Sequence, residues 1–203
     1  ARQLRGHYLC EQAYAALESG DNATAGEFYE DALRDQNQDL RARMGLARLR
    51  LSAGDPEAAL THFKVVMGSG RNCTPELLAL LSEICAAKDD GPQYLAALEE
   101  YYALQSSSLL ALALASELEK QRGRVAAEAF LRKTLTTHPS VSVAASLVLQ
   151  GLQSDTSLPE RELFDRLTSA AEGYQCGHCG FTGKVRHWRC PGCRHWDSIH
   201  YRG

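Results

Sequence analysis

The sequence predicts an all-α protein, a solenoid of antiparallel helix pairs that leads into a small C-terminal module built around cysteines. Two observations predict this arrangement. Small and aromatic residues recur every 34 residues in the first part of the chain, and four cysteines form two Cys-x-x-Cys pairs near its end. A repeat of that length is typical of a two-helix unit, which buries its apolar face by stacking on its neighbours.

Six positions carry the repeat. Ala13, Leu17, Gly20, Asp21, Ala25 and Tyr29 return as Ala47, Leu51, Gly54, Asp55, Ala59 and Phe63. We expect the alanines where two helices approach closely, the aromatic ring in the gap toward the next unit, and the glycine in a left-handed turn. This pattern resembles the tetratricopeptide repeat, and less regular units follow at 75–105 and 108–139. Residues 1–139 are therefore predicted to form about four helix pairs.

Helix starts are signalled by capping residues. Asp55-Pro56 and Thr74-Pro75 each place a cap before Pro at the first helical position, and Ser157 to Glu160 form a capping box. We expect helices at residues 5–18, 23–36, 39–53, 56–68, 75–87, 91–104, 108–121, 124–137, 140–151 and 159–172. The last two, within 140–173, would cap the solenoid.

Residues 174–203 are predicted to form a separate metal-binding module. Cys176 and Cys179 make one Cys-x-x-Cys turn, and Cys190 and Cys193 make the other. Four thiolates complete a tetrahedral site for one iron or zinc ion, and four unligated thiols or two redox pairs are the alternatives. About 30 residues bury too little core to fold alone, so we expect the ion to be structural.

The first Cys-x-x-Cys turn continues with Gly180 and Phe181, which resembles rubredoxin. The second departs from that pattern, because Arg194 stands where rubredoxin usually has Gly, and the connecting loop is shorter. The connection to the preceding helix is short, so we expect the module to dock rigidly on it. The docking residues are predicted to be Leu163, Phe164, Leu167, Trp188 and Trp196. Stacking of the two tryptophans on nucleic acid is the alternative.

Tetratricopeptide families line a concave groove with the first helix of each unit. Carrying that register over places His7, Cys10, Tyr14 and Leu17 on the groove, followed by Arg41, Met44, Arg48 and Leu51. We select Tyr14, Arg41, Met44 and Arg48 as candidate partner-binding residues. Arg41 and Arg48 lie on one helix face and could hold an acidic peptide, while an ordinary solvated face is the alternative.

Nothing in the sequence suggests an enzyme, because no nucleophile motif, Walker loop or Gly-x-Gly-x-x-Gly fingerprint is present. Residues 174–203 carry five basic and one acidic residue, whereas the net charge of the whole chain is −3. The total of seven cysteines is odd, which is unlike a disulfide framework and favours a reducing compartment. Cys10, Cys73 and Cys85 are interpreted as small core residues.

The repeats, joined to YQCGHCGF and RHWRCPGC near the chain end, resemble the lipopolysaccharide assembly protein B family of Gram-negative bacteria. The resemblance implies a non-enzymatic adaptor on the cytoplasmic side of the inner membrane, anchored by an N-terminal helix that this chain lacks. Its implied partners are a membrane AAA+ protease, the lipid A pathway deacetylase whose proteolysis it modulates, and other lipopolysaccharide assembly proteins, with a homo-oligomer left open. A rubredoxin-like iron redox protein and a zinc-ribbon nucleic-acid binder are the alternatives.

Overall fold

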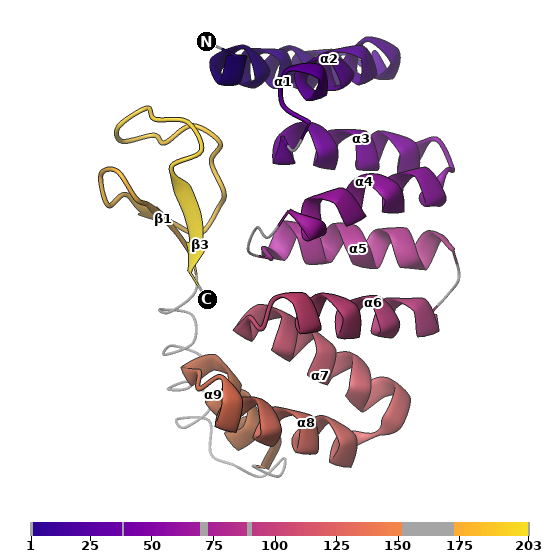
Figure 1. Ribbon diagram of the computed structural model, residues 1–203, viewed down its shortest axis with the longest axis vertical. Helices are drawn as coiled ribbons and strands as arrows, with labels where there is room; N and C mark the ends of the chain where they lie inside the picture. The colour runs from indigo at the N-terminus through magenta and orange to yellow at the C-terminus, as the bar shows by residue number, and fades with distance from the viewer. Residues whose placement is uncertain (1, 38, 70–72, 89–90, 152–172, 203) are drawn as a thin grey trace. The chain divides into compact units, whose positions relative to one another are not determined.

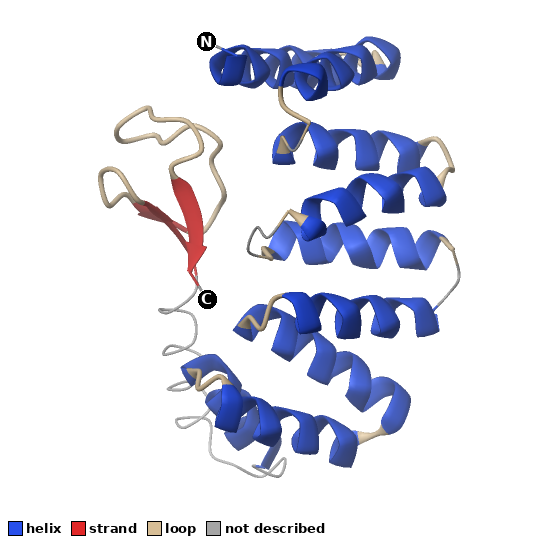
Figure 2. Ribbon diagram, in the orientation of Figure 1, coloured by secondary structure: helices blue, strands red, loops and turns tan. Residues whose placement is uncertain are grey.

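The computed structural model describes residues 2–37, 39–69, 73–88, 91–151 and 173–202. Packing divides the chain into two compact units, Ala1–Ala97 and Leu98–Gly203, with the boundary inside helix α6. Among the described residues as far as position 151 the regular elements are helices joined by short loops, and short strands appear in the C-terminal module (Figure 2). The predicted domain boundaries at residues 139 and 173 stay predictions.

The described residues contain nine helices, and the predicted all-α repeat fold with a small C-terminal module is confirmed. The helices are α1 Arg2–Glu18, α2 Asn22–Asp35, α3 Leu40–Ser52, α4 Pro56–Gly68, α5 Pro75–Ala87, α6 Gly91–Leu104, α7 Ser108–Arg122, α8 Arg124–Thr137 and α9 Val141–Gly151. Each lies within three residues of its predicted range at both ends. The tenth predicted helix, at 159–172, and its capping box fall outside the described residues.

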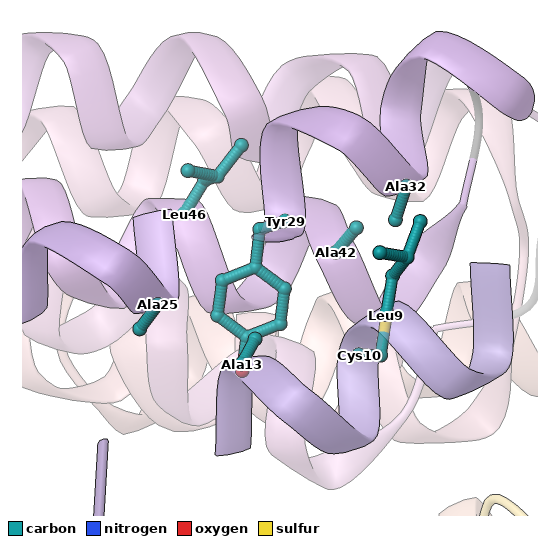
Figure 3. Packing of buried hydrophobic residues seen from close by; sticks show 8 residues of the cluster. All are labelled: Leu9, Cys10, Ala13, Ala25, Tyr29, Ala32, Ala42 and Leu46. Carbon is teal, nitrogen blue, oxygen red and sulfur yellow. The ribbon is translucent and has the colours of Figure 1, made fainter. Parts of the chain in front are cut away.

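Successive helices of the first unit pack as antiparallel neighbours, α1 on α2, α2 on α3 and α3 on α4 (Figure 1). The alanines and the aromatic residues of the repeat are buried in the helix packing, as predicted. Ala13 and Ala25 are fully buried, and Tyr29 is buried among alanines of three helices (Figure 3). The small side chains let the helices approach closely, and the tyrosine ring fills the remaining space.

Helix ends in the first unit follow the sequence signals closely. Gly20 and Gly54 have φ of 81° and 78°, the left-handed conformation that only glycine adopts without strain. Asp21 and Asp55 then cap the next helices by accepting hydrogen bonds from the backbone N–H groups of Thr24 and Ala58, each at 3.0 Å. The Gly-Asp pair of the repeat is therefore a compact helix-to-helix turn.

The cap predicted at Thr74 is only half correct. Thr74 occupies the N-cap position of α5, and its carbonyl accepts hydrogen bonds from the backbone N–H groups of Leu77 and Leu78. Its side chain, however, makes no capping hydrogen bond. Proline at the first helical position of α5 supplies the start signal instead, since its fixed φ suits a helix and it has no N–H to satisfy.

The scattered cysteines are core residues, as predicted. Cys10, Cys73 and Cys85 are all buried. Burial raises the pKa of the Cys73 thiol to about 12, so this thiol stays protonated and unreactive at neutral pH.

Helices α7, α8 and α9 of the second unit pack around a core of Ala111, Ala115, Leu131 and Val143. Gly123 joins α7 to α8 directly, with a φ of 85°. From α6, the Tyr102 ring meets the Phe130 ring edge-on, with ring centroids 5.2 Å apart. The Tyr102 hydroxyl also donates to the Thr134 hydroxyl oxygen at 3.3 Å. These contacts hold the end of α6 against α8.

Candidate metal centre

The C-terminal module is built on a three-stranded antiparallel sheet, and one of its four cysteines lies in a strand. Its strands are β1 Gly173–Cys176, β2 Thr182–Gly183 and β3 Ile199–Arg202, in the order β2-β1-β3. Cys176 ends β1 opposite Ile199, the first residue of β3. The other three cysteines lie on the turns between β1 and β3, so the sheet fixes one ligand and the turns must bring the others to it.

The four sulfur atoms come together at one point. The Sγ atoms of Cys176 and Cys193 are 3.7 Å apart, those of Cys179 and Cys190 are 3.6 Å apart, and all four lie within 4.8 Å of one another. A tetrahedral ion with metal–sulfur bonds of about 2.3 Å needs sulfur–sulfur distances of about 3.8 Å. The donor set and its spacing therefore fit one tetrathiolate-bound ion.

The two Cys-x-x-Cys turns share one hydrogen-bond pattern. In each, the residue directly after the second cysteine donates its backbone N–H to the carbonyl of the first cysteine: Gly180 to Cys176 and Arg194 to Cys190, both at 2.9 Å. Gly180 has a φ of 77° and Arg194 a φ of 59°. The second turn therefore needs the same left-handed residue as the first, and arginine adopts this conformation at a cost that glycine avoids.

Ser198 is a further part of the site. Its hydroxyl lies 3.3 Å from the Cys176 sulfur and 3.1 Å from the His195 carbonyl. The Ser198 hydroxyl, assisted by backbone N–H groups, lowers the pKa of Cys176 to about 5, although burial opposes the shift. A lowered thiol pKa favours the thiolate, which is the form that binds metal.

Cys193 illustrates why the site needs a cation. The backbone N–H of His195 lowers the pKa of its thiol, but burial and the three neighbouring thiols raise it to about 12. Four thiolates at these distances repel one another unless a positive ion lies between them. When bound, the ion supplies that charge and ties the two turns to the sheet. The cysteines hold it, and their backbone turns fix the coordination geometry.

The core of the module is built from its own residues. Tyr174, Cys176, Cys190 and Ile199 are buried together, with Phe181 and Tyr201 packed against them. Trp188 and Trp196, which are predicted to dock on helix 159–172, are half-buried. The guanidinium groups of Arg186 and Arg189 lie over their rings, at 4.4 and 5.5 Å from the ring centroids. The predicted docking residues Leu163, Phe164 and Leu167 fall outside the described residues, so docking stays a prediction.

The predicted partner-binding residues differ in how available they are. Tyr14 is 54% exposed, and Arg48 is exposed as well. Arg41 is mostly buried and donates to Glu11 at 2.6 Å. Met44 is 5% exposed, so it supports the surface from beneath rather than offering side-chain atoms to a partner. Of the wider groove register, His7 and Cys10 are also buried.

Three residues beside the ligands make contacts that the cysteine spacing does not predict. Ser198 lies five residues beyond the last cysteine, outside both Cys-x-x-Cys turns. His178, inside the first Cys-x-x-Cys turn, and His195, two residues after Cys193, stack with ring centroids 3.7 Å apart. Histidines among cysteines do suggest a metal site in general, but the stacking depends on how the two turns face each other, which spacing alone does not reveal.

Helix pairs with a 34-residue repeat, followed by a tetracysteine module, define a class: tetratricopeptide-repeat proteins with a rubredoxin-type metal-binding domain. Family comparisons agree, since the tetratricopeptide repeat matches residues 16–84 and the rubredoxin metal binding domain matches residues 174–200. The chain is a homologue of proteins named lipopolysaccharide assembly protein B. It is 22% identical to the Escherichia coli protein over 95% of its own length, and 24% identical to the Haemophilus influenzae protein over 79%.

The chain spans about half the length of these relatives, covering 51% and 42% of the two proteins. A solved structure of a thermophilic tetratricopeptide-repeat protein from Thermus thermophilus is 21% identical, with 81% of this chain and 88% of that chain covered and a TM-score of 0.41. None of the helices in the described ranges has the length and apolar character that crossing a membrane requires.

Proposed function

We propose that this chain is the partner-binding part of a non-enzymatic adaptor that regulates lipopolysaccharide biosynthesis. The full protein would act on the cytoplasmic side of the bacterial inner membrane. There it would bring the lipid A pathway deacetylase to a membrane AAA+ protease and so modulate its proteolysis. Other lipopolysaccharide assembly proteins are further proposed partners, and self-association is compatible with the same role.

One observation carries this proposal: the similarity to lipopolysaccharide assembly protein B extends through both the repeats and the metal module. Stacked helix pairs present broad surfaces for protein binding, which suits an adaptor. Tyr14 and Arg48, which we assign to the groove face by the tetratricopeptide register, are exposed and so available to a partner. An arginine on such a face suits carboxylates of an acidic segment, because its guanidinium binds them in bidentate fashion.

The adaptor proposal is tested in cells with the full-length protein. We expect Arg48→Glu to weaken capture of the deacetylase and to change its half-life, because the new charge repels an acidic partner. Lys64→Glu is the control for the change of charge, since Lys64 is exposed on α4, the second helix of the same pair, away from the predicted first-helix groove. An unchanged half-life with Arg48→Glu would remove this residue from the proposed surface, and a half-life independent of the whole protein would remove the proposed function.

We propose that the ion has a structural role, and redox chemistry is the alternative. The ion itself is zinc or iron, since the matching domain is of the rubredoxin type. Visible absorption of the purified protein separates the two ions, because tetrathiolate iron absorbs visible light and zinc does not. Reversible bleaching by a mild reductant, together with loss of the regulatory effect on reduction, would favour the redox alternative. We propose no nucleic-acid binding.

A further inference from the structure

A cavity opens between three helices of the second unit. Its volume is about 440 Å³, within the range of protein sites that bind ligands. It is lined by α6 through Glu99 and Tyr102, by α7 through Leu114, Leu118 and Arg122, and by α8 through Ala126, Phe130 and Lys133, among others. None of these residues belongs to the metal centre or to the predicted groove.

The floor of the cavity is apolar and firmly built. Leu114 and Leu118 are buried in the helix packing, while the Phe130 ring is held edge-on by Tyr102. Such a floor can receive an apolar side chain from outside without rearranging the helices. Removing that side chain from water would favour binding, because burial of apolar surface is favourable.

The rim of the cavity is positively charged. Arg122 and Glu99 form an ion pair at 3.3 Å, so the two charges largely compensate each other. Lys133 is exposed on the neighbouring helix, and its ammonium forms no ion pair with any residue that the structure describes. A bound carboxylate would complement Lys133 and could share the guanidinium of Arg122 with Glu99.

A second cavity of about 320 Å³ continues the first, since both are lined by Tyr102, Thr134 and Thr137. Its other lining residues are mostly hydroxyl-bearing: Ser106, Ser107, Ser108 and Ser140, together with His138. Several of these hydroxyls already bond within the protein: Ser108 donates to Ser140, Ser107 accepts from the backbone N–H of Leu110, and Ser106 donates to the Tyr102 carbonyl. A hydroxyl has one donor and two acceptor positions, so each keeps capacity for a further hydrogen bond, which a peptide backbone can use and an acyl chain cannot. The two cavities together therefore favour a protein segment over a lipid tail.

The position of this double cavity separates it from the groove. The predicted groove face of α7 follows from aligning Ala59 of the second repeat with Ala127. In this alignment Met44, Arg48 and Leu51 correspond to Leu112, Ser116 and Glu119. The cavity is instead lined by Leu114 and Leu118. Two residues of helix correspond to a rotation of about 200°, so the cavity faces away from the predicted groove.

We propose that this double cavity is a second docking site, which binds a protein segment carrying an apolar side chain next to a carboxylate. The apolar side chain enters between Tyr102, Leu118 and Phe130, and the carboxylate pairs with Lys133 at the rim. The backbone of the segment runs over the hydroxyl-lined cavity. This site deepens the proposed adaptor function, on which its biological meaning rests, but direct binding tests it independently.

The test is fluorescence anisotropy with the purified chain and a labelled, C-terminally amidated nine-residue peptide of Leu, Phe, Glu and Ser. Two comparison peptides replace its Glu by Lys or its Leu and Phe by Ser, and a labelled fatty acid represents a lipid ligand. We expect only the first peptide to bind. Equal binding of the Lys peptide, tighter binding of the fatty acid, or no peptide binding would each overturn the proposal.

Matched variants locate the binding site. Lys133→Glu should weaken peptide binding by roughly threefold to tenfold, as expected for an exposed charge pair that is reversed. Arg132→Glu, its exposed neighbour outside the cavity lining, should change binding less than twofold. Equal effects of the two variants would show that only the general charge matters and would overturn the site.

A second pair of variants tests the cavity itself. Ala126→Trp should fill the cavity and weaken binding more than tenfold, whereas Ala129→Trp, exposed on the same helix outside the lining, should not. Both proteins are first checked for unchanged helix content by circular dichroism. Intact binding with Ala126→Trp would place the peptide elsewhere. Loss of peptide binding with an unchanged deacetylase half-life would leave the proposed function standing and remove only this site from it.

Discussion

The ring of Tyr29 determines which residue can stand at position 45. A Cβ atom added to Gly45 would lie 2.3 Å from the tyrosine ring, closer than any real carbon contact, whereas one added to Gly26 would meet nothing nearer than 3.9 Å. Tyr29 is almost fully buried by α1, α2 and α3, so it has little room to move away. Gly45 is thus a packing residue, in contrast to Gly20 and Gly54, whose role is conformational.

We predict that Gly45→Ala destabilises the first unit by about 1–3 kcal/mol, the usual cost of overpacking a core. Gly26→Ala is the control, because it also exchanges glycine for alanine inside a helix. It should instead be neutral or stabilise by up to about 1 kcal/mol, since alanine favours the helix. Urea unfolding followed by circular dichroism measures both changes. Equal stability of the two variants would mean that Tyr29 yields to the added methyl group.

The two cysteine turns adopt the same backbone conformation with different residues at the same position. Both turns return a hydrogen bond to the first cysteine carbonyl, and both need a left-handed residue after the second cysteine. Gly180 meets this need without strain. Arg194 holds the same conformation through the surrounding structure, in which its carbonyl accepts a hydrogen bond from the Arg189 side chain at 3.1 Å.

Arg194→Gly should therefore stabilise the loaded module by about 1 kcal/mol, the approximate cost of a left-handed residue with a Cβ atom. Because metal binding and folding of so small a module are coupled, we expect metal to be held about fivefold more tightly. Competition with a chromophoric chelator measures this affinity. Arg194→Ala keeps the Cβ atom and loses the charge, so a gain with alanine as large as with glycine would exclude backbone strain as the cause.

Helix positions could be predicted well from the sequence because their ends depend on local chemistry. Asp55-Pro56 at the start of α4 and Gly20 after α1 act within one turn of the chain. The four metal ligands could be predicted for the same reason, since two residues of spacing aim both sulfurs of a turn at one point. Contacts between distant segments could not: the Gly45–Tyr29 contact, the burial of Met44 and the cavity beside Lys133 depend on how helices stack.

Two kinds of stability coexist in one chain. The helix pairs bury apolar cores of their own, such as the one around Tyr29 and the one around Leu131. The module buries only a small cluster, and two of its four fully buried residues are the ligands Cys176 and Cys190. A core made largely of ligands loses its centre when the ion leaves, whereas the helix cores contain no ligand.

We predict that removing the metal unfolds the module while the helices remain. Both tryptophans of the chain, Trp188 and Trp196, lie in the module, so their fluorescence reports on the module alone. Treatment with a strong chelator should shift tryptophan emission to longer wavelength, as the rings enter water, with little loss of helical circular dichroism. Adding one equivalent of zinc should reverse the shift. Cys190→Ser should show the shifted emission from the start, because three thiolates hold the ion more weakly. Unshifted emission from a protein shown to be metal-free would mean that the module folds on its own core, and that the ion has a role other than holding it together.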